Sequence, residues 1–60
     1  MKVDTIQQYY VKQYLEDNFY IEELKLTLID RYTILVEDCN QDRMYFYYDM
    51  ESKKVMYREA

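Results

Sequence analysis

The chain of 60 residues contains neither glycine nor proline, and this restricts its turns and loops. Glycine adopts the left-handed backbone conformation at no steric cost, and glycine-rich loops cradle phosphate groups. Asparagine tolerates the same conformation and can serve where glycine is missing. Histidine is also absent, so no imidazole can shuttle protons near neutral pH or bind a metal. The sequence therefore disfavours phosphate-loop and histidine-based active sites.

The length of the chain indicates one domain, residues 1–60, with a small core. A chain this short buries only about 60% of the surface that its unfolded form exposes. Small domains are commonly stabilised by disulfides, a metal or a partner subunit. Cys39 is the only cysteine, so an internal disulfide is excluded, and the Cys and His groups of a structural zinc site are lacking. Self-association remains, and we predict a homodimer.

Apolar residues at helical spacing predict a helix in the first third of the chain. Asp4 is the expected N-cap, with Gln7 three residues later completing an approximate capping box. Asp17 and Asn18 form the best stop signal, because asparagine tolerates left-handed backbone, and the alternative is a helix that continues to about Glu23. The predicted apolar face consists of Val3, Ile6, Tyr10, Val11, Tyr14 and Leu15.

The remainder of the chain alternates between apolar and polar residues, which is typical of strands. Strands are expected at 23–30, 32–37, 43–50 and 54–58, with turns at 30–31, 38–42 and 51–53. Short connections imply sequential antiparallel pairing. The predicted fold is α+β, with one N-terminal helix packed on a four-stranded antiparallel meander in two layers. The sheet face toward the helix would carry Leu24, Leu26, Leu28, Ile34, Val36, Phe46 and Tyr48.

The opposite sheet face is the candidate functional surface. It would carry Leu35, Tyr45, Tyr47 and Met56, together with Thr27. Exposed apolar patches of this kind often mark interaction sites, and Tyr and Met are favoured in protein interfaces. The alternative is that tyrosines occur there as good strand formers that tolerate half exposure. We predict a protein interface formed by Leu35, Tyr45, Tyr47 and Met56.

The net charge of −4 limits the kinds of partner. It disfavours direct nucleic-acid binding, which depends on clustered Lys and Arg, and it disfavours an anionic membrane surface. The first ten residues, MKVDTIQQYY, lack the apolar run of a signal peptide or a transmembrane helix. One cysteine and no export signal fit a reducing cytoplasm, which is the predicted location.

The acidic residues are better explained as a solvated surface than as catalytic or metal-binding groups. The carboxylate pairs Glu22-Glu23 and Glu37-Asp38 are sequence neighbours, whereas acid–base chemistry needs two environments across a cleft. The segment 38–42 resembles the opening of a calcium loop, but Arg43 replaces its glycine and Asp49 its final glutamate. We therefore expect no enzymatic activity, no metal and no cofactor.

The leading functional hypothesis is a small non-enzymatic interaction protein, a homodimer that binds and modulates or inhibits a larger protein. Many residues with AT-rich codons, together with the small size and the acidity, suggest a phage or mobile-element factor directed against a host system. The alternative is an acidic DNA mimic that blocks a nucleic-acid-binding enzyme. Steep loss of binding with added salt would distinguish the mimic.

Overall fold

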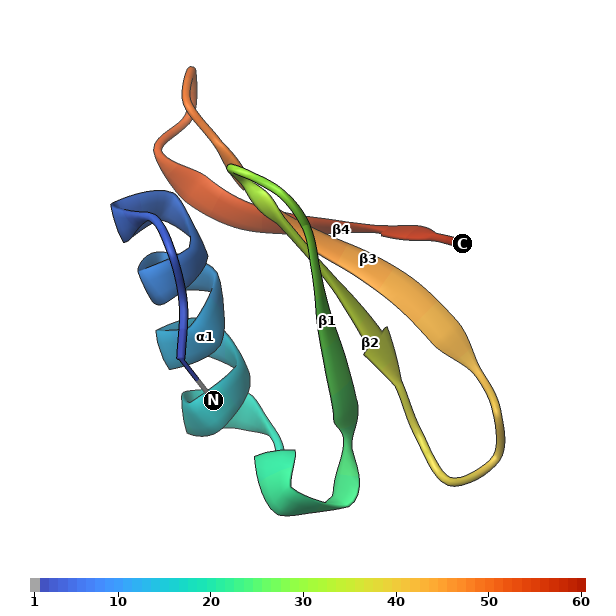
Figure 1. The fold of residues 1–60 in the computed structure, drawn as a ribbon. Coiled ribbons are helices and arrows are strands. Elements are labelled where there is room, and N and C mark those ends of the chain that lie inside the picture. Colours follow the sequence, from blue (N-terminus) through green and yellow to red (C-terminus); the bar gives the residue numbers. More distant parts are fainter. Residues whose placement is uncertain (1) are drawn as a thin grey trace.

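The computed structural model describes residues 2–60 and contains one α-helix and one sheet (Figure 1). Helix α1 spans Ile6–Asn18, and a short 3-10 helix, η1, spans Ile21–Glu23. The strands are β1 (Lys25–Asp30), β2 (Thr33–Glu37), β3 (Arg43–Asp49) and β4 (Lys54–Glu59). They form an antiparallel sheet in the order β1-β2-β3-β4. The predicted α+β fold, a helix followed by a four-stranded meander, is confirmed.

Helix α1 begins one residue later than predicted. Thr5 is the N-cap, and its Oγ1 accepts a hydrogen bond of 3.1 Å from the Gln8 amide. The Gln8 side-chain oxygen accepts in return from the backbone amides of Thr5 and Asp4, at 3.2 and 2.7 Å. The Asp4–Gln7 capping box is therefore wrong. The Gln8 side chain also donates a hydrogen bond to the β1–β2 turn, whereas Gln7 is on a different side of the helix. This contact with the sheet fixes the N-cap at Thr5.

The predicted end of α1 at Asn18 is confirmed, but by a different mechanism. The C-cap is Phe19, whose backbone is extended with φ −140°. Asn18 acts through its side chain instead, since its Nδ2 donates to the Tyr14 carbonyl oxygen at 2.8 Å. The next residues form η1, and this turn of 3-10 helix delays the first strand from the expected position 23 to Lys25.

Each of the three turns between strands begins with an aspartate whose carboxylate accepts backbone hydrogen bonds. Asp30 Oδ1 accepts from the Tyr32 amide at 2.9 Å, and Asp49 Oδ1 accepts from the Glu51 amide at 3.3 Å. Asp38 Oδ1 accepts twice, from the amides of Asn40 and Asp42, at 2.9 and 3.0 Å. Aspartate commonly nucleates turns in this way. In a chain without glycine, these carboxylates organise the hairpins.

Left-handed backbone occurs in two of these turns, at Gln41 with φ 67° and at Lys53 with φ 59°. This conformation costs a residue with a Cβ roughly 1–2 kcal/mol, which is why glycine usually occupies it. The two turns are therefore local sites of backbone strain.

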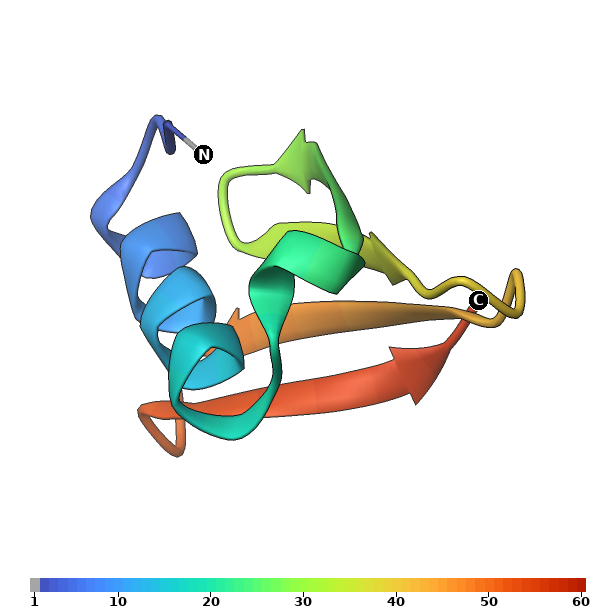
Figure 2. The same ribbon diagram turned by 90° about the horizontal axis from the view of Figure 1, so that it is seen from below.

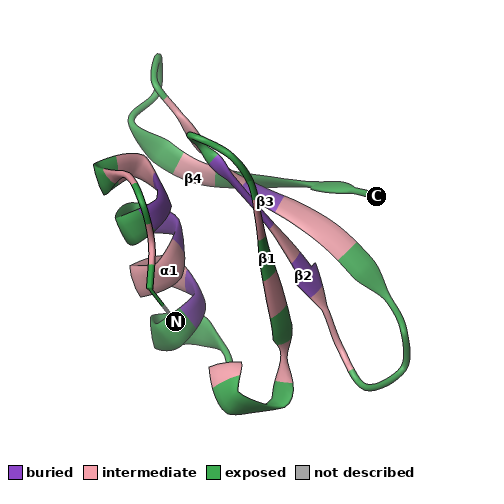
Figure 3. Cartoon of the chain, in the orientation of Figure 1, coloured by how far each residue is buried: buried purple, intermediate pink, exposed green. Residues whose placement is uncertain are grey.

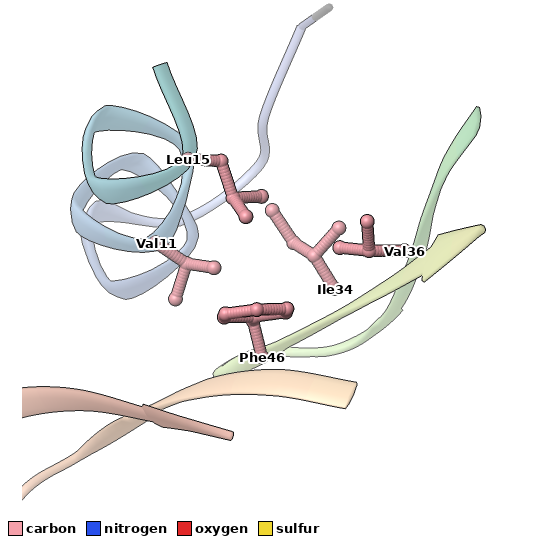
Figure 4. Packing of buried hydrophobic residues seen from close by; sticks show 5 residues of the cluster. All are labelled: Val11, Leu15, Ile34, Val36 and Phe46. Atoms are coloured by element: carbon pink, nitrogen blue, oxygen red, sulfur yellow. The ribbon is translucent and has the colours of Figure 1, made fainter. Parts of the chain in front are cut away.

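The core lies between α1 and the centre of the sheet (Figure 4). Val11 and Leu15 project from α1 toward Ile34, Val36 and Phe46, and all five are buried. Ile34 of β2 pairs with Phe46 of β3, and this register places residues of both strands under the helix. Partly buried residues surround this cluster, namely Tyr14, Ile21, Leu24, Leu26, Leu28, Met44, Tyr48 and Val55. The predicted helix-facing side of the sheet is confirmed.

Helix α1 covers only one side of the sheet. It contacts β2, β3 and β4, and residues 2–60 place no element on the opposite side (Figures 1 and 2). Burial is concentrated along the sheet-facing side of α1, in β2 and in the middle of β3, whereas β4 is largely exposed (Figure 3). We call the uncovered side the outer face. Ile6, expected on the apolar side of the helix, is 60% exposed because it lies at the first turn, beyond the core.

Candidate functional site

The structure brings the four predicted interface residues together on the outer face. Leu35 of β2 pairs directly with Tyr45 of β3, and Tyr47 of β3 pairs with Met56 of β4. Alternate residues of a strand share a face, so the two pairs adjoin. We call these four residues the outer patch. Leu35, Tyr45 and Tyr47 are half-buried, and Met56 is 41% exposed.

Arg58 of β4 borders the outer patch. Its guanidinium carbon lies 4.8 Å from the centre of the Tyr45 ring, a cation–π contact. Arg58 and Tyr45 are also register partners. Arg58 also borders a shallow depression, open to solvent, whose lining includes Thr33 and Tyr47.

Charges on the outer face nearly cancel. Lys25, Glu37 and Arg43 form one cross-strand row, and Asp49 pairs with Lys54. Arg58 and Asp30 are the remaining charged residues of this face. The outer face therefore holds the bases Lys25, Arg43, Lys54 and Arg58 and the acids Asp30, Glu37 and Asp49. The excess negative charge of the chain lies elsewhere, on the helix, its connection to β1, and the turns.

Asp30 lies at the β1–β2 turn, at the end of the outer face. The backbone hydrogen bond from Tyr32 holds the pKa of this carboxyl below its ordinary value. The Thr33 hydroxyl acts in the same direction, and the positive charge of Arg58 adds to it. The carboxylate form thus stabilises the turn.

A second apolar region, on the helix side, was missed in the sequence. Phe19, the residue after α1, is 46% exposed although its ring lies 5.9 Å from the Phe46 ring in an edge-on arrangement. Beside these two rings is a half-open pocket of about 150 Å³, with walls formed by Phe19, Leu24, Val36, Met44 and Phe46 and with Asp38 and Asp42 at its rim. The Phe19-Tyr20 pair directly after the helix stop was the available signal, since large aromatics are unusual in a polar connection.

The acidic loop 38–42 is held by hydrogen bonds between its own residues. Asp38 uses Oδ1 to bind two amides of the loop, and Cys39 is exposed with a free thiol. Within the described range 2–60, no three His, Cys, Asp or Glu side chains are grouped closely enough to hold a metal ion. In the same range, no helix has the length and apolarity needed to cross a membrane.

Comparisons of the chain with protein-family models, with curated proteins and with solved structures found no match. The two apolar regions, the outer patch and the helix-side pocket, are the candidate binding surfaces of the chain.

Proposed function

We propose that this chain is a small non-enzymatic interaction protein that forms a homodimer through the outer patch and binds and modulates a larger protein. The observation that carries this proposal is the contiguous placement of Leu35, Tyr45, Tyr47 and Met56 on a sheet face that no described part of the chain covers. Tyrosine and methionine in such a cluster are typical of interface centres.

The charge pattern of the outer face supports pairing with a second copy. In a two-fold symmetric interface the same surface meets itself, so a strongly charged face would repel its partner. The outer face instead alternates bases and acids in register, as in the row Lys25, Glu37 and Arg43. Two such faces can align with opposite charges in contact and with the outer patches stacked about 10 Å apart.

The small size of the core also supports pairing with a second copy. Its fully enclosed hydrophobic side chains are Val11, Leu15 and Ile34, with Val36 and Phe46 close to that state. A single core in a domain below about 70 residues rarely supplies more than about 3–5 kcal/mol of stability. Covering the outer patch would remove additional apolar surface from water and increase that stability.

Sedimentation equilibrium tests the proposal. We expect a concentration-dependent dimer for the native chain and a monomer for the double variant Tyr45→Ala/Tyr47→Ala. The matched control is Tyr9→Ala/Tyr20→Ala, which removes two exposed tyrosines from the helix side and should leave the dimer unchanged. Circular dichroism checks that each variant is folded. A native chain that stays monomeric at high micromolar concentration, or a folded outer-patch variant that still dimerises, would refute the proposal.

The larger partner is proposed to be a cytoplasmic protein of the cell in which the chain acts, and the chain is proposed to inhibit it, as a phage or mobile-element factor would inhibit a host system. The exposed free thiol of Cys39 supports a reducing location. Capture from a host lysate with the native chain and with the outer-patch variant would separate partner binding from dimerisation.

A further inference from the structure

We propose that the helix-side pocket binds a partner segment in which one aromatic or branched aliphatic side chain is flanked by lysine or arginine on both sides. This inference names the chemistry of the larger partner and rests on the proposed function for the existence of that partner. The pocket lies on the side of the sheet opposite the outer patch, so one chain could dimerise through the outer patch and bind its partner through the pocket.

The size and walls of the pocket specify an apolar anchor. Its volume of about 150 Å³ equals that of engineered apolar cavities that bind benzene. Phe19 and Phe46 supply aromatic walls, and Leu24, Val36 and Met44 supply aliphatic ones. Phe19 is partly exposed and Phe46 is buried, and an apolar pocket with aromatic walls is typical of the sites that dominate binding energy.

The rim specifies positive charge on one side of the anchor. Asp38 and Asp42 lie at the edge of the pocket. Two amide hydrogen bonds to its Oδ1 fix the Asp38 carboxylate in position, so it needs little ordering to meet a cation. Glu59, near the end of β4, adds a third carboxylate beside this rim, in a depression that Arg43 also borders.

A second acidic depression adjoins the pocket at Phe19. Phe19 belongs at the same time to a depression lined by Glu16, Asp17 and Tyr20 at the end of α1. The C-terminus of a helix carries partial negative charge, and the last turn of α1 contains no basic residue to offset it. Acids from two separate elements, the 38–42 loop and the end of α1, thus adjoin the apolar pocket, and the complementary segment carries bases on both sides of its anchor.

The competing occupant is the basic groove of a DNA-binding protein, to which the chain would present its acids as a DNA mimic. Such a groove binds through charge alone and has no need of an apolar anchor. An apolar pocket with aromatic walls beside the two acidic regions favours the mixed apolar and basic segment.

Nuclear magnetic resonance titration of the full chain tests the inference. The probe is a short peptide with one phenylalanine flanked by two lysines on each side. Two comparison peptides replace the phenylalanine by serine, or the lysines by glutamate. We expect saturable amide shifts around Phe19, Leu24 and Met44 with the first peptide and none with the other two.

Variants locate the contacts. Met44→Phe fills the pocket and should abolish binding, whereas Met56→Phe on the outer patch makes the same change in residue type and should leave peptide binding intact. Asp38→Asn keeps the oxygen that binds the loop amides but removes the charge, and it should weaken binding about two- to fivefold. The Tyr45→Ala/Tyr47→Ala variant should bind the peptide as the native chain does, even if it no longer dimerises.

Each contrary outcome overturns the inference in a recognisable way. Equal binding of the serine peptide, lost steeply with salt, would indicate the purely electrostatic mimic. Equal binding of the glutamate peptide, shifts confined to another surface, or no shifts at all would exclude the pocket as a binding site. None of these outcomes bears on dimerisation, which sedimentation measures separately.

Discussion

The side-chain nitrogen of Gln8 donates a hydrogen bond of 2.7 Å to the backbone carbonyl oxygen of Asp30. Gln8 is 3% exposed, and its side-chain oxygen simultaneously accepts from the amides of Asp4 and Thr5. The Thr5 hydroxyl adds a second link, a 2.6 Å hydrogen bond to the carbonyl oxygen of Arg31. Gln8 thus completes the capping box of α1 and also links the helix to the β1–β2 turn.

Gln8→Glu should lower the free energy of unfolding by about 2–3 kcal/mol at pH 7, because it replaces a buried donor by a carboxylate facing a carbonyl oxygen. Protonation restores a donor, so the loss should be smaller near pH 4 than at pH 7. Urea unfolding at both pH values measures this. The control Gln7→Glu, in the same helical turn, should change stability by less than about 0.5 kcal/mol. Equal effects of the two substitutions would contradict this role of Gln8.

Asp30 should contribute to acid unfolding. Its pKa is lower in the folded chain than in the unfolded chain, first through the Tyr32 amide hydrogen bond. Its contribution is therefore complete above the unfolded pKa, about 3.9, and is lost as the pH falls through the lower folded value. Asp30→Asn retains a turn-forming oxygen but does not titrate. Urea midpoints measured from pH 5 to pH 2 should fall less for this variant than for the native chain, and parallel curves would disprove the contribution.

Lys53→Gly should stabilise the protein by about 0.5–1 kcal/mol. The substitution relieves the strain of a Cβ at φ 59°, and part of the gain is offset by the greater chain entropy of glycine in the unfolded state. Thermal unfolding of this variant should be compared with that of Lys54→Gly, which places glycine in extended strand β4 and should destabilise it. A lower melting temperature for Lys53→Gly would show that the turn is unstrained.

Leu15→Ala should cost about 2–5 kcal/mol, because Leu15 is fully buried in the core and its truncation leaves a cavity. In a domain of this size that loss approaches the whole stability, so chemical unfolding should start from a partly unfolded population. Ile6→Ala removes a similar side chain from an exposed site of the same helix and should cost well under 1 kcal/mol. Comparable losses would mean that the core extends to the first helical turn.

The sheet was predictable from sequence because its alternation has a period of two and each strand carries apolar residues on one side. Ile34, Val36 and Phe46 could hardly lie anywhere but under the helix once that pattern was recognised. The start of α1 was less predictable, since Asp4–Gln7 and Thr5–Gln8 satisfy the same spacing. The choice between them depends on the long-range hydrogen bond from Gln8 to Asp30, which local spacing does not contain.

The two candidate surfaces also differ in how far the local sequence pattern predicts them. The outer patch follows from alternation within β2, β3 and β4, so Leu35, Tyr45, Tyr47 and Met56 could be grouped in advance. The helix-side pocket joins Phe19 and Leu24, on the connection after α1, to Met44 of β3. That arrangement depends on how the connection folds back over the sheet, and periodicity carries no information about it.

The aspartates that open the three turns have a consequence for how related sequences would vary. Where glycine entered one of these hairpins, the backbone could reverse direction without help from a carboxylate, and the matching acidic residue would be released from selection. Acidity at positions 30, 38 and 49 would then covary with the turn composition of a lineage. A comparison across such lineages would separate charge retained for architecture from charge retained for recognition.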